Sequence, residues 1–195
     1  MLVQKTLMNE VTNLNSIIIG NRIPKDFFVT SGVGESDITI HAGSYHLALR
    51  NAGIEPYNIM TYSSTLPSVA NKLDSKPKNL VHGSVMETIM ACANSEKGKR
   101  ATAGLIFGWI YSKINGNKTG GFVCEYNGNL SEEEACESLK ASLNELYVNG
   151  YEEDYELRDV ELLTKSIIPK KNFGTVLIAL CFVNHLYPIP DIGDS

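Results

Sequence analysis

The sequence has no block of basic residues, no long hydrophobic run and no secretory pattern at its N-terminus. It carries 17 lysines and arginines against 22 acidic residues, and the net charge of −5 gives no reason to expect nucleic acid or an anionic membrane as a partner. No segment reaches the roughly 18 apolar residues that a membrane-spanning helix requires. We therefore expect a cytoplasmic protein that binds neither nucleic acid nor membrane.

Motifs for added cofactors are also missing. The four cysteines are scattered without CxxC spacing, so we expect reduced thiols. The four histidines show neither HxH nor HxxxH spacing, so we expect no metal site. Gly32 and Gly34 lack the third glycine and the following helix of a dinucleotide-binding loop. They instead predict a turn at the end of a buried strand over residues 23–30.

Length and composition indicate an ordinary globular protein. The chain has 195 residues, of which 43% are hydrophobic and 20% are charged, and this suits one domain with one core. Strand-like segments outnumber helical ones, and residues 101–113 and 121–126 predict a hairpin across the polar turn at 115–117. We predict an α+β fold, a single-domain, antiparallel-rich αββα sandwich with helices on its outer faces.

Two helices have recognisable ends. Ser131 and Glu134 have the spacing of a capping box, and the helix that follows is expected to end at Gly150. Ser44 is expected to cap the start of a short helix, with Gly53 as the left-handed residue after its last turn.

The adjacent serines Ser63 and Ser64 stand between the apolar segment 58–60 and Pro67. Because Pro67 lacks an amide proton and disfavours helix before it, the bond between the serines is predicted at a strand-to-loop junction. A serine pair by itself most often closes a turn. The polar residues 68–78 that follow predict a surface loop.

Further segments share the order and spacing of one known family. They are residues 27–37, 44–54, 57–59, 82–87, 120–126 and 173–180. With the serine pair, they resemble the pyruvoyl-dependent arginine decarboxylases, particularly the bacterial, chlamydial-type branch, from about residue 27 to about residue 182. The resemblance implies a self-cleaving proenzyme that assembles as a homotrimer of cleaved protomers, with active sites between neighbours.

The resemblance also implies the chemistry. Ser64 attacks the carbonyl of Ser63, and elimination then leaves residues 1–63 as the β chain and residues 64–195 as the α chain, which begins with a pyruvoyl group. An amino acid substrate forms a Schiff base with this ketone, and the group accepts the electron pair released with carbon dioxide. No pyridoxal phosphate or metal is required. The default reaction converts L-arginine to agmatine and CO2, a step of polyamine biosynthesis.

Glu125 and Asn58 are the other catalytic candidates. Glu125 stands in the apolar segment 122–126 and matches the family's proton donor, a role that needs an acid with a raised pKa. From the local pattern alone, Glu125 would be a strand residue that faces solvent. Asn58 matches an asparagine that, in the family, helps to hold the processing site and the substrate. The alternative interpretation is that Asn58 only caps the transition from loop to strand.

His46 departs from the family pattern, because arginine-cleaving members carry an aspartate there that faces the substrate guanidinium. A histidine does not supply the same bidentate anionic partner. Three interpretations follow: another acid binds arginine, with Glu35, Asp37 and Glu87 as candidates; the substrate is a different amino acid; or His46 only packs on its helix. His46, Glu35 and Glu87 are therefore the predicted substrate-binding residues.

Two alternative functions stay open at this point. In the first, the chain is a non-catalytic homologue that acts as a subunit or binding protein; in the second, it cleaves itself only for maturation and decarboxylates no amino acid. The intact Ser63 and Ser64 pair together with Glu125 argues against the first alternative.

Overall fold

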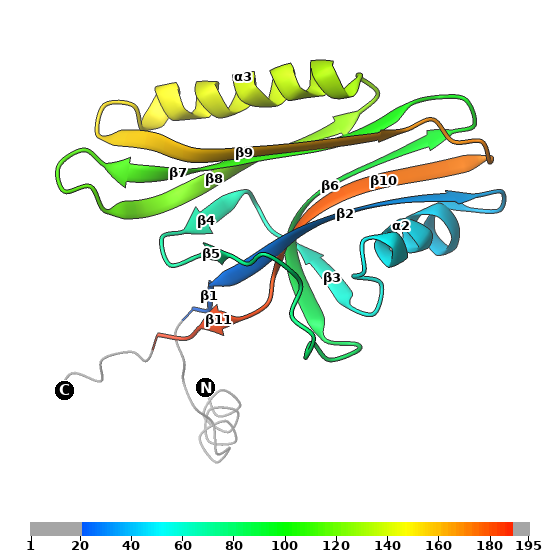
Figure 1. Cartoon of the computed structure of the whole chain (residues 1–195), viewed down its shortest axis with the longest axis horizontal. Coiled ribbons are helices and arrows are strands. Elements are labelled where there is room, and N and C mark those ends of the chain that lie inside the picture. The colour runs from blue at the N-terminus through cyan, green and yellow to red at the C-terminus, as the bar shows by residue number, and fades with distance from the viewer. Residues whose placement is uncertain (1–20, 189–195) are drawn as a thin grey trace, which may run out of the picture. The chain divides into compact units, whose positions relative to one another are not determined.

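The computed structural model describes residues 21–188, and its compact unit spans Pro24–His185 (Figure 1). A second unit, Met1–Ile23 with Leu186–Ser195, falls mostly outside the described residues. The prediction of one domain over residues 1–195 extends into that part of the chain and stays a prediction. The short strands β1 (Ile23–Pro24) and β11 (His185–Leu186) form a two-stranded sheet.

A five-stranded sheet forms one layer of the Pro24–His185 unit. Its strands, in spatial order, are β3 (Asn58–Thr61), β6 (Val85–Glu96), β10 (Phe173–Phe182), β2 (Asp26–Ser36) and β5 (Asn71–Lys72). The long strand β10 is antiparallel to both of its neighbours, whereas the short edge strands β3 and β5 run parallel to theirs. The nearly continuous apolar sequence of β10 fits this central position, because nine of its ten residues are buried.

A four-stranded antiparallel sheet forms the other layer. Its strands, in spatial order, are β4 (Thr65–Pro67), β8 (Lys118–Gly128), β7 (Ala101–Ser112) and β9 (Tyr155–Ile167). The predicted hairpin is confirmed as β7 and β8, which pair from Thr102 with Gly128 to Tyr111 with Lys118.

The main core lies between the two sheets. It combines side chains of β2, β6 and β10 with side chains of β4, β7 and β8, among them Phe27, Ile89, Phe107, Val123 and Leu180. A second apolar cluster packs helix α2 (His46–Asn51) against the five-stranded sheet, and a third packs α3 (Glu132–Gly150) against the four-stranded sheet. Figure 1 shows the two helices on opposite sides of the strands. The prediction of an α+β fold rich in antiparallel strands is confirmed.

The start of α3 follows its sequence signals, but the start of α2 does not. The Ser131 hydroxyl accepts a hydrogen bond from the Glu134 amide, and the Glu134 carboxylate accepts one from the Ser131 amide, which confirms the capping box. The prediction of Ser44 as a helix cap is wrong. Ser44 is buried inside a π-helical turn (Ile40–Tyr45) that leads into α2, and its hydroxyl lies 2.8 Å from that of Thr175.

The predicted turn at Gly32 and Gly34 is also wrong, because β2 continues through both residues. A Cβ atom at Gly32 would lie 2.0 Å from the carbonyl oxygen of Ala48, and one at Gly34 would lie 2.2 Å from that of Ser44. The glycines therefore let helical backbone lie directly on the strand, which any side chain would prevent.

Candidate active site

The two serines form the crossover between the sheets. β3 is an edge strand of the five-stranded sheet and β4 is an edge strand of the four-stranded sheet (Figure 1). Ser63 and Ser64 lie between the end of β3 at Thr61 and the start of β4 at Thr65. The predicted strand-to-loop junction is therefore confirmed.

Backbone hydrogen bonds hold the crossover at both ends. The amide of Tyr62 donates to the carbonyl oxygen of Thr88 on β6 over 2.7 Å, and the amide of Val123 on β8 donates to the carbonyl oxygen of Ser64 over 3.0 Å. Ser63 is exposed and Ser64 is half-buried. The bond between the serines is thus accessible while its two flanks are fixed.

The side chain of Ser64 meets Glu125. Its hydroxyl donates to the Glu125 carboxylate, with Oγ 2.7 Å from Oε1 and 2.8 Å from Oε2. Glu125 lies on β8 and is half-buried. Burial raises the pKa of its carboxyl above the ordinary value, and the hydrogen bond from Ser64 partly opposes that shift. The pair therefore joins a serine hydroxyl to a carboxylate that accepts protons more readily than free glutamate does.

The carbonyl group of Ser63 also has a hydrogen-bond donor. Its oxygen accepts a hydrogen bond of 2.9 Å from the amide of Thr65, which closes a three-residue γ-turn around Ser64. This amide withdraws electron density from the carbonyl that the Ser64 hydroxyl would attack. Sequence reasoning missed the donor, because backbone amides leave no residue-type signal.

Asn58 has structural contacts at the start of β3. Its side-chain amide donates to the carbonyl oxygen of Gly83 over 2.7 Å, and its backbone amide donates to that of Ser84 over 2.9 Å. These bonds hold the loop before β6 against β3. A role of Asn58 toward substrate stays a prediction.

His46 is half exposed, and its Nε2 lies 3.8 Å from a carboxylate oxygen of Glu55. Sequence reasoning missed Glu55, which lies in the turn region between α2 and β3, nine positions after His46. No motif marked it; only the expectation of an acid near His46 could have directed attention to this turn.

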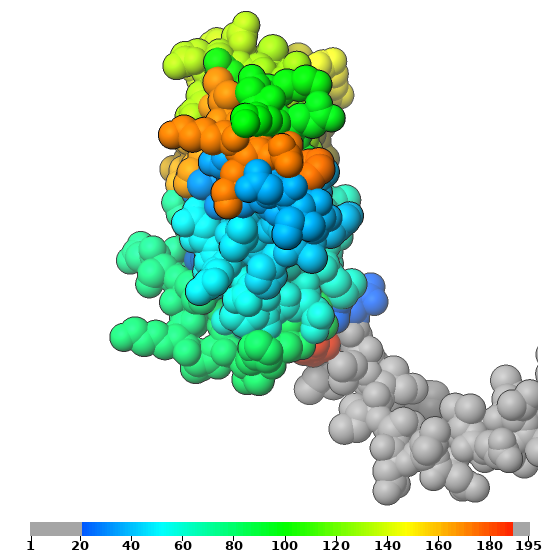
Figure 2. Space-filling model, turned by 90° about the vertical axis from the view of Figure 1, so that its right-hand side faces the viewer, coloured from blue at the N-terminus to red at the C-terminus, as the bar shows by residue number. Residues whose placement is uncertain are grey.

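The other predicted substrate-binding acids contact different parts of the fold. Glu35 accepts hydrogen bonds from the amides of Lys170 and Lys171, at 2.6 and 3.0 Å. In Figure 2 the blue segment that contains Glu35 and the orange segment around Lys170 lie side by side. Asp37 accepts a bond from the amide of Asn172 over 3.3 Å. Their substrate-binding role stays a prediction.

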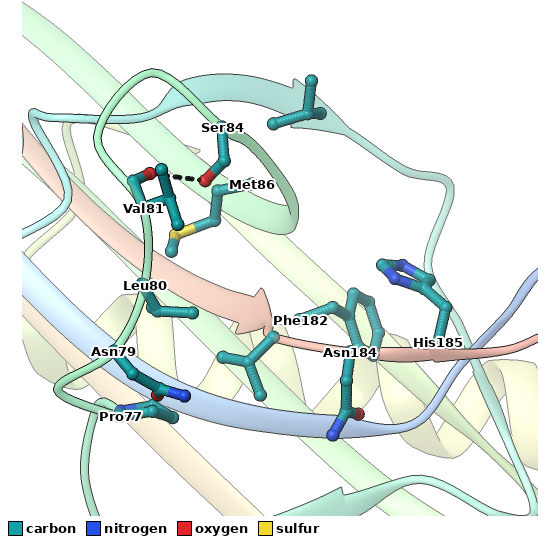
Figure 3. A pocket seen from close by; sticks show the side chains of 11 residues that line it. Pro77, Asn79, Leu80, Val81, Ser84, Met86, Phe182, Asn184 and His185 are labelled. Carbon is teal, nitrogen blue, oxygen red and sulfur yellow. Dashed lines mark hydrogen bonds between the residues drawn. The ribbon is translucent and has the colours of Figure 1, made fainter.

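Glu87 is 2% exposed, and one of its carboxylate oxygens lies in close contact with Nε2 of His185. His185 also lines a cavity of about 440 Å³ between the loop before β6 and the end of β10 (Figure 3). In that view Leu80, Met86 and Phe182 supply apolar lining of the same cavity. The proposed contact of Glu87 with substrate stays a prediction.

Within residues 21–188, no three histidine, cysteine or acidic side chains come together in a way that could hold a metal ion. In the same part of the chain, no helix has the length and apolar character needed to cross a membrane.

Comparison with known proteins identifies the family. Residues 26–186 match the family model described as pyruvoyl-dependent arginine decarboxylase. The chain belongs to this family. The chain is 34% identical to the pyruvoyl-dependent arginine decarboxylase AaxB of Chlamydia muridarum over 186 residues, which cover 85% of this chain and 93% of the relative. Identity is 33% to AaxB of Chlamydia pneumoniae, with the same coverage. Identity is 28% to the pyruvoyl-dependent arginine decarboxylase of Pyrococcus abyssi over 159 residues, which cover 80% of this chain and 94% of the relative.

Membership of this family makes the chain a pyruvoyl-dependent decarboxylase, a carboxy-lyase whose cofactor is a covalent pyruvoyl group in place of pyridoxal phosphate. The residues at the crossover fit that group. A serine has the three carbon atoms that a pyruvoyl group needs, and at Ser64 the hydroxyl is hydrogen-bonded to Glu125 while the carbonyl oxygen accepts a hydrogen bond from Val123 on β8.

Proposed function

We propose that the chain cleaves itself between Ser63 and Ser64 and then decarboxylates L-arginine to agmatine. The observation that carries the proposal is the hydrogen bond between the Ser64 hydroxyl and the Glu125 carboxylate, located in an accessible crossover. The names of the Chlamydia and Pyrococcus relatives support arginine as the substrate. We further propose that each protomer folds as an αββα sandwich. We also propose that three cleaved protomers assemble into a homotrimer and that the protein is cytoplasmic.

In the cleavage step, Glu125 takes the proton of the Ser64 hydroxyl as Oγ attacks the carbonyl carbon of Ser63. Negative charge develops on the Ser63 carbonyl oxygen, where the Thr65 amide already donates a hydrogen bond. The C–N bond between Ser63 and Ser64 breaks and the freed nitrogen of Ser64 takes up a proton, so the amide becomes an ester. Elimination then removes the Cα proton of Ser64 and breaks its Cβ–Oγ bond, which releases Ser63 as a carboxylate. Hydrolysis of the remaining enamine releases ammonia and leaves the pyruvoyl group.

Both products of this cleavage keep their places in the sheets. The piece that ends at Ser63 contributes β2, which pairs with β10 along ten residues, and β3, which pairs with β6. The piece that begins at Ser64 starts next to β4, which pairs with β8. Strand pairing therefore supports retention of the β chain without a covalent bond.

When present, the pyruvoyl group supplies the electron-accepting carbonyl that decarboxylation needs. Glu125 then acts as the proton donor to the substrate carbon. Conversion of Ser64 removes the hydroxyl whose hydrogen bond lowers the pKa of Glu125. The increase in pKa caused by burial is then less opposed, so the pKa of Glu125 rises further. The same carboxyl thus changes from a base in the first reaction to an acid in the second.

Glu55 is our candidate for the acid that replaces the family's aspartate. Its carboxylate lies beside His46 and its side chain is 35% exposed, so a guanidinium could pair with it. An amino acid with a different side chain is the alternative substrate, because His46 departs from the family pattern.

A denaturing intact-mass spectrum of purified protein tests the cleavage, with Ser64→Ala as the matched variant. Two fragments that meet between Ser63 and Ser64, with a pyruvoyl-blocked C-terminal piece in the wild type only, are expected. Wild-type protein that stays unbroken after prolonged incubation would favour the non-catalytic homologue.

Carbon dioxide release from arginine, ornithine, lysine, histidine, aspartate and glutamate then tests the substrate, and release from an acidic amino acid alone would exclude arginine. Cleaved protein that releases none from any of them would favour cleavage for maturation only.

A further inference from the structure

Two connections join the edges of β6 and β8 near Glu125. The first is the serine crossover, whose backbone is hydrogen-bonded to Thr88 on β6 and to Val123 on β8. The second is a side-chain hydrogen bond. The backbone amide of Cys92 on β6 donates to Oδ1 of Asn127 on β8, with 2.5 Å between the nitrogen and the oxygen.

The two connections have matching positions on both strands. Cys92 follows Thr88 by four residues, and Asn127 follows Val123 by four residues. Four residues of strand correspond to about 13 Å. Glu125 lies midway on β8, two residues from each connection. It is therefore framed by the crossover on one side and by the side chain of Asn127 on the other.

No strand within residues 21–188 pairs with these edges beyond the crossover. β3 pairs with β6 only as far as Thr88, and the ladder between β4 and β8 reaches Phe122. The amide of Cys92 would otherwise face an open edge. A cavity of about 410 Å³ adjoins this hydrogen bond and is lined by Arg100 and Asn129 as well as by Cys92 and Asn127.

We propose that Asn127 is a positioning residue, which keeps the edges of β6 and β8 in register around Glu125 after the bond between Ser63 and Ser64 is cut. Before cleavage the crossover ties the two edges covalently. After cleavage the ends at Ser63 and Ser64 are separate, and within residues 21–188 the bond to the Asn127 side chain is the hydrogen bond that still joins β6 directly to β8 next to Glu125. This inference rests on the proposed function.

Two variants and a control test this role. Asn127→Leu keeps the branching of the side chain without the acceptor, although leucine is larger, whereas Asn127→Asp keeps an acceptor oxygen and adds a negative charge near Glu125. Asn129→Leu is the control, because Asn129 lines the same cavity and its side chain has no hydrogen bond within residues 21–188. Each protein is fully cleaved before assay, and kcat is expressed per pyruvoyl group.

For Asn127→Leu we expect kcat for decarboxylation to fall about tenfold, since small misplacements of a catalytic group are costly, with KM changed less than twofold. Hydrogen exchange at the Cys92 amide should quicken by about two- to tenfold, the range for losing one ordinary hydrogen bond. Asn127→Asp should retain slow exchange and shift the pH profile of kcat upward, because its charge raises the pKa of Glu125. Asn129→Leu should match the wild type in kcat and in hydrogen exchange at the Cys92 amide.

A comparison of melting temperatures separates the cleaved from the uncleaved state. Asn127→Leu should lower the melting temperature more in cleaved protein than in the uncleavable Ser64→Ala background, at one protein concentration. Equal losses in both backgrounds, unchanged Cys92 exchange, or equal activity losses in Asn127→Leu and Asn129→Leu would each overturn the proposal. Failure of the proposed function is distinguishable, since it would be seen in the wild type as an unbroken chain or as absence of decarboxylation.

Discussion

Replacing Glu125 with glutamine removes the proton acceptor that we propose for self-cleavage, while keeping the shape of the site. In the wild type the Ser64 hydroxyl lies 2.7 and 2.8 Å from the two carboxylate oxygens of Glu125. In the variant the amide oxygen can still accept this hydrogen bond, but it does not take up the proton. General-base catalysis contributes about 10²- to 10⁴-fold, so we expect self-cleavage of Glu125→Gln to be at least about 100-fold slower. The assay follows chain splitting over time by denaturing mass spectrometry.

Glu125→Asp is the matched control. It keeps a carboxylate but withdraws it by about 1.5 Å, the length of one carbon–carbon bond, so cleavage should be slowed less than in Glu125→Gln. In the wild type the cleavage rate should rise with pH through the pKa of Glu125, because the ionised carboxylate is the base. Burial raises that pKa, so the inflection should lie above that of free glutamate. Cleavage of Glu125→Gln at the wild-type rate would refute the role of Glu125 as base.

Three further outcomes are expected. Decarboxylation by cleaved enzyme should fall as pH rises through the pKa of Glu125, the opposite of the cleavage step, and a rate that instead rises there would argue against Glu125 as proton donor. Glu55→Gln should raise KM for arginine by roughly 10- to 100-fold with little change in kcat, as measured by steady-state kinetics, and unchanged KM would exclude Glu55 as the guanidinium partner. Gly34→Ala should destabilise the fold by about 3 kcal/mol in denaturant titrations, because its Cβ would meet the Ser44 carbonyl. Gly116→Ala is the control: a Cβ there has no atom within 4 Å, so this variant should lose stability only through backbone strain.

Local signals predicted the elements whose stability is mainly local. The capping box at Ser131 and the hairpin of β7 and β8 depend on residues close in sequence, and both formed as expected. Ser44 and the two glycines of β2 were misread because their surroundings come from distant segments. Ser44 bonds to Thr175 on β10, and Gly32 makes room for Ala48 of α2.

The same distinction applies to the candidate site. Family motifs pointed to Ser64 and Glu125, which are 61 positions apart, and the structure brings them into direct contact. Glu55 and Asn127 carried no comparable signal, because their contacts depend on how a turn and two sheet edges meet. The Thr65 amide left no signal at all, since every residue except proline has such a donor.

The ladder between β2 and β10 would have a thermodynamic consequence for the cleaved protein that we propose. An uncut monomer unfolds in a unimolecular reaction, so the melting temperature of that single chain does not depend on how much protein is present. Once the bond between Ser63 and Ser64 is broken, full unfolding must separate β2 from β10 as two molecules, and their reassociation is governed by mass action. The stability of the cleaved form therefore rises with concentration, and after dilution under denaturing conditions the native pairing depends on two chains finding each other again.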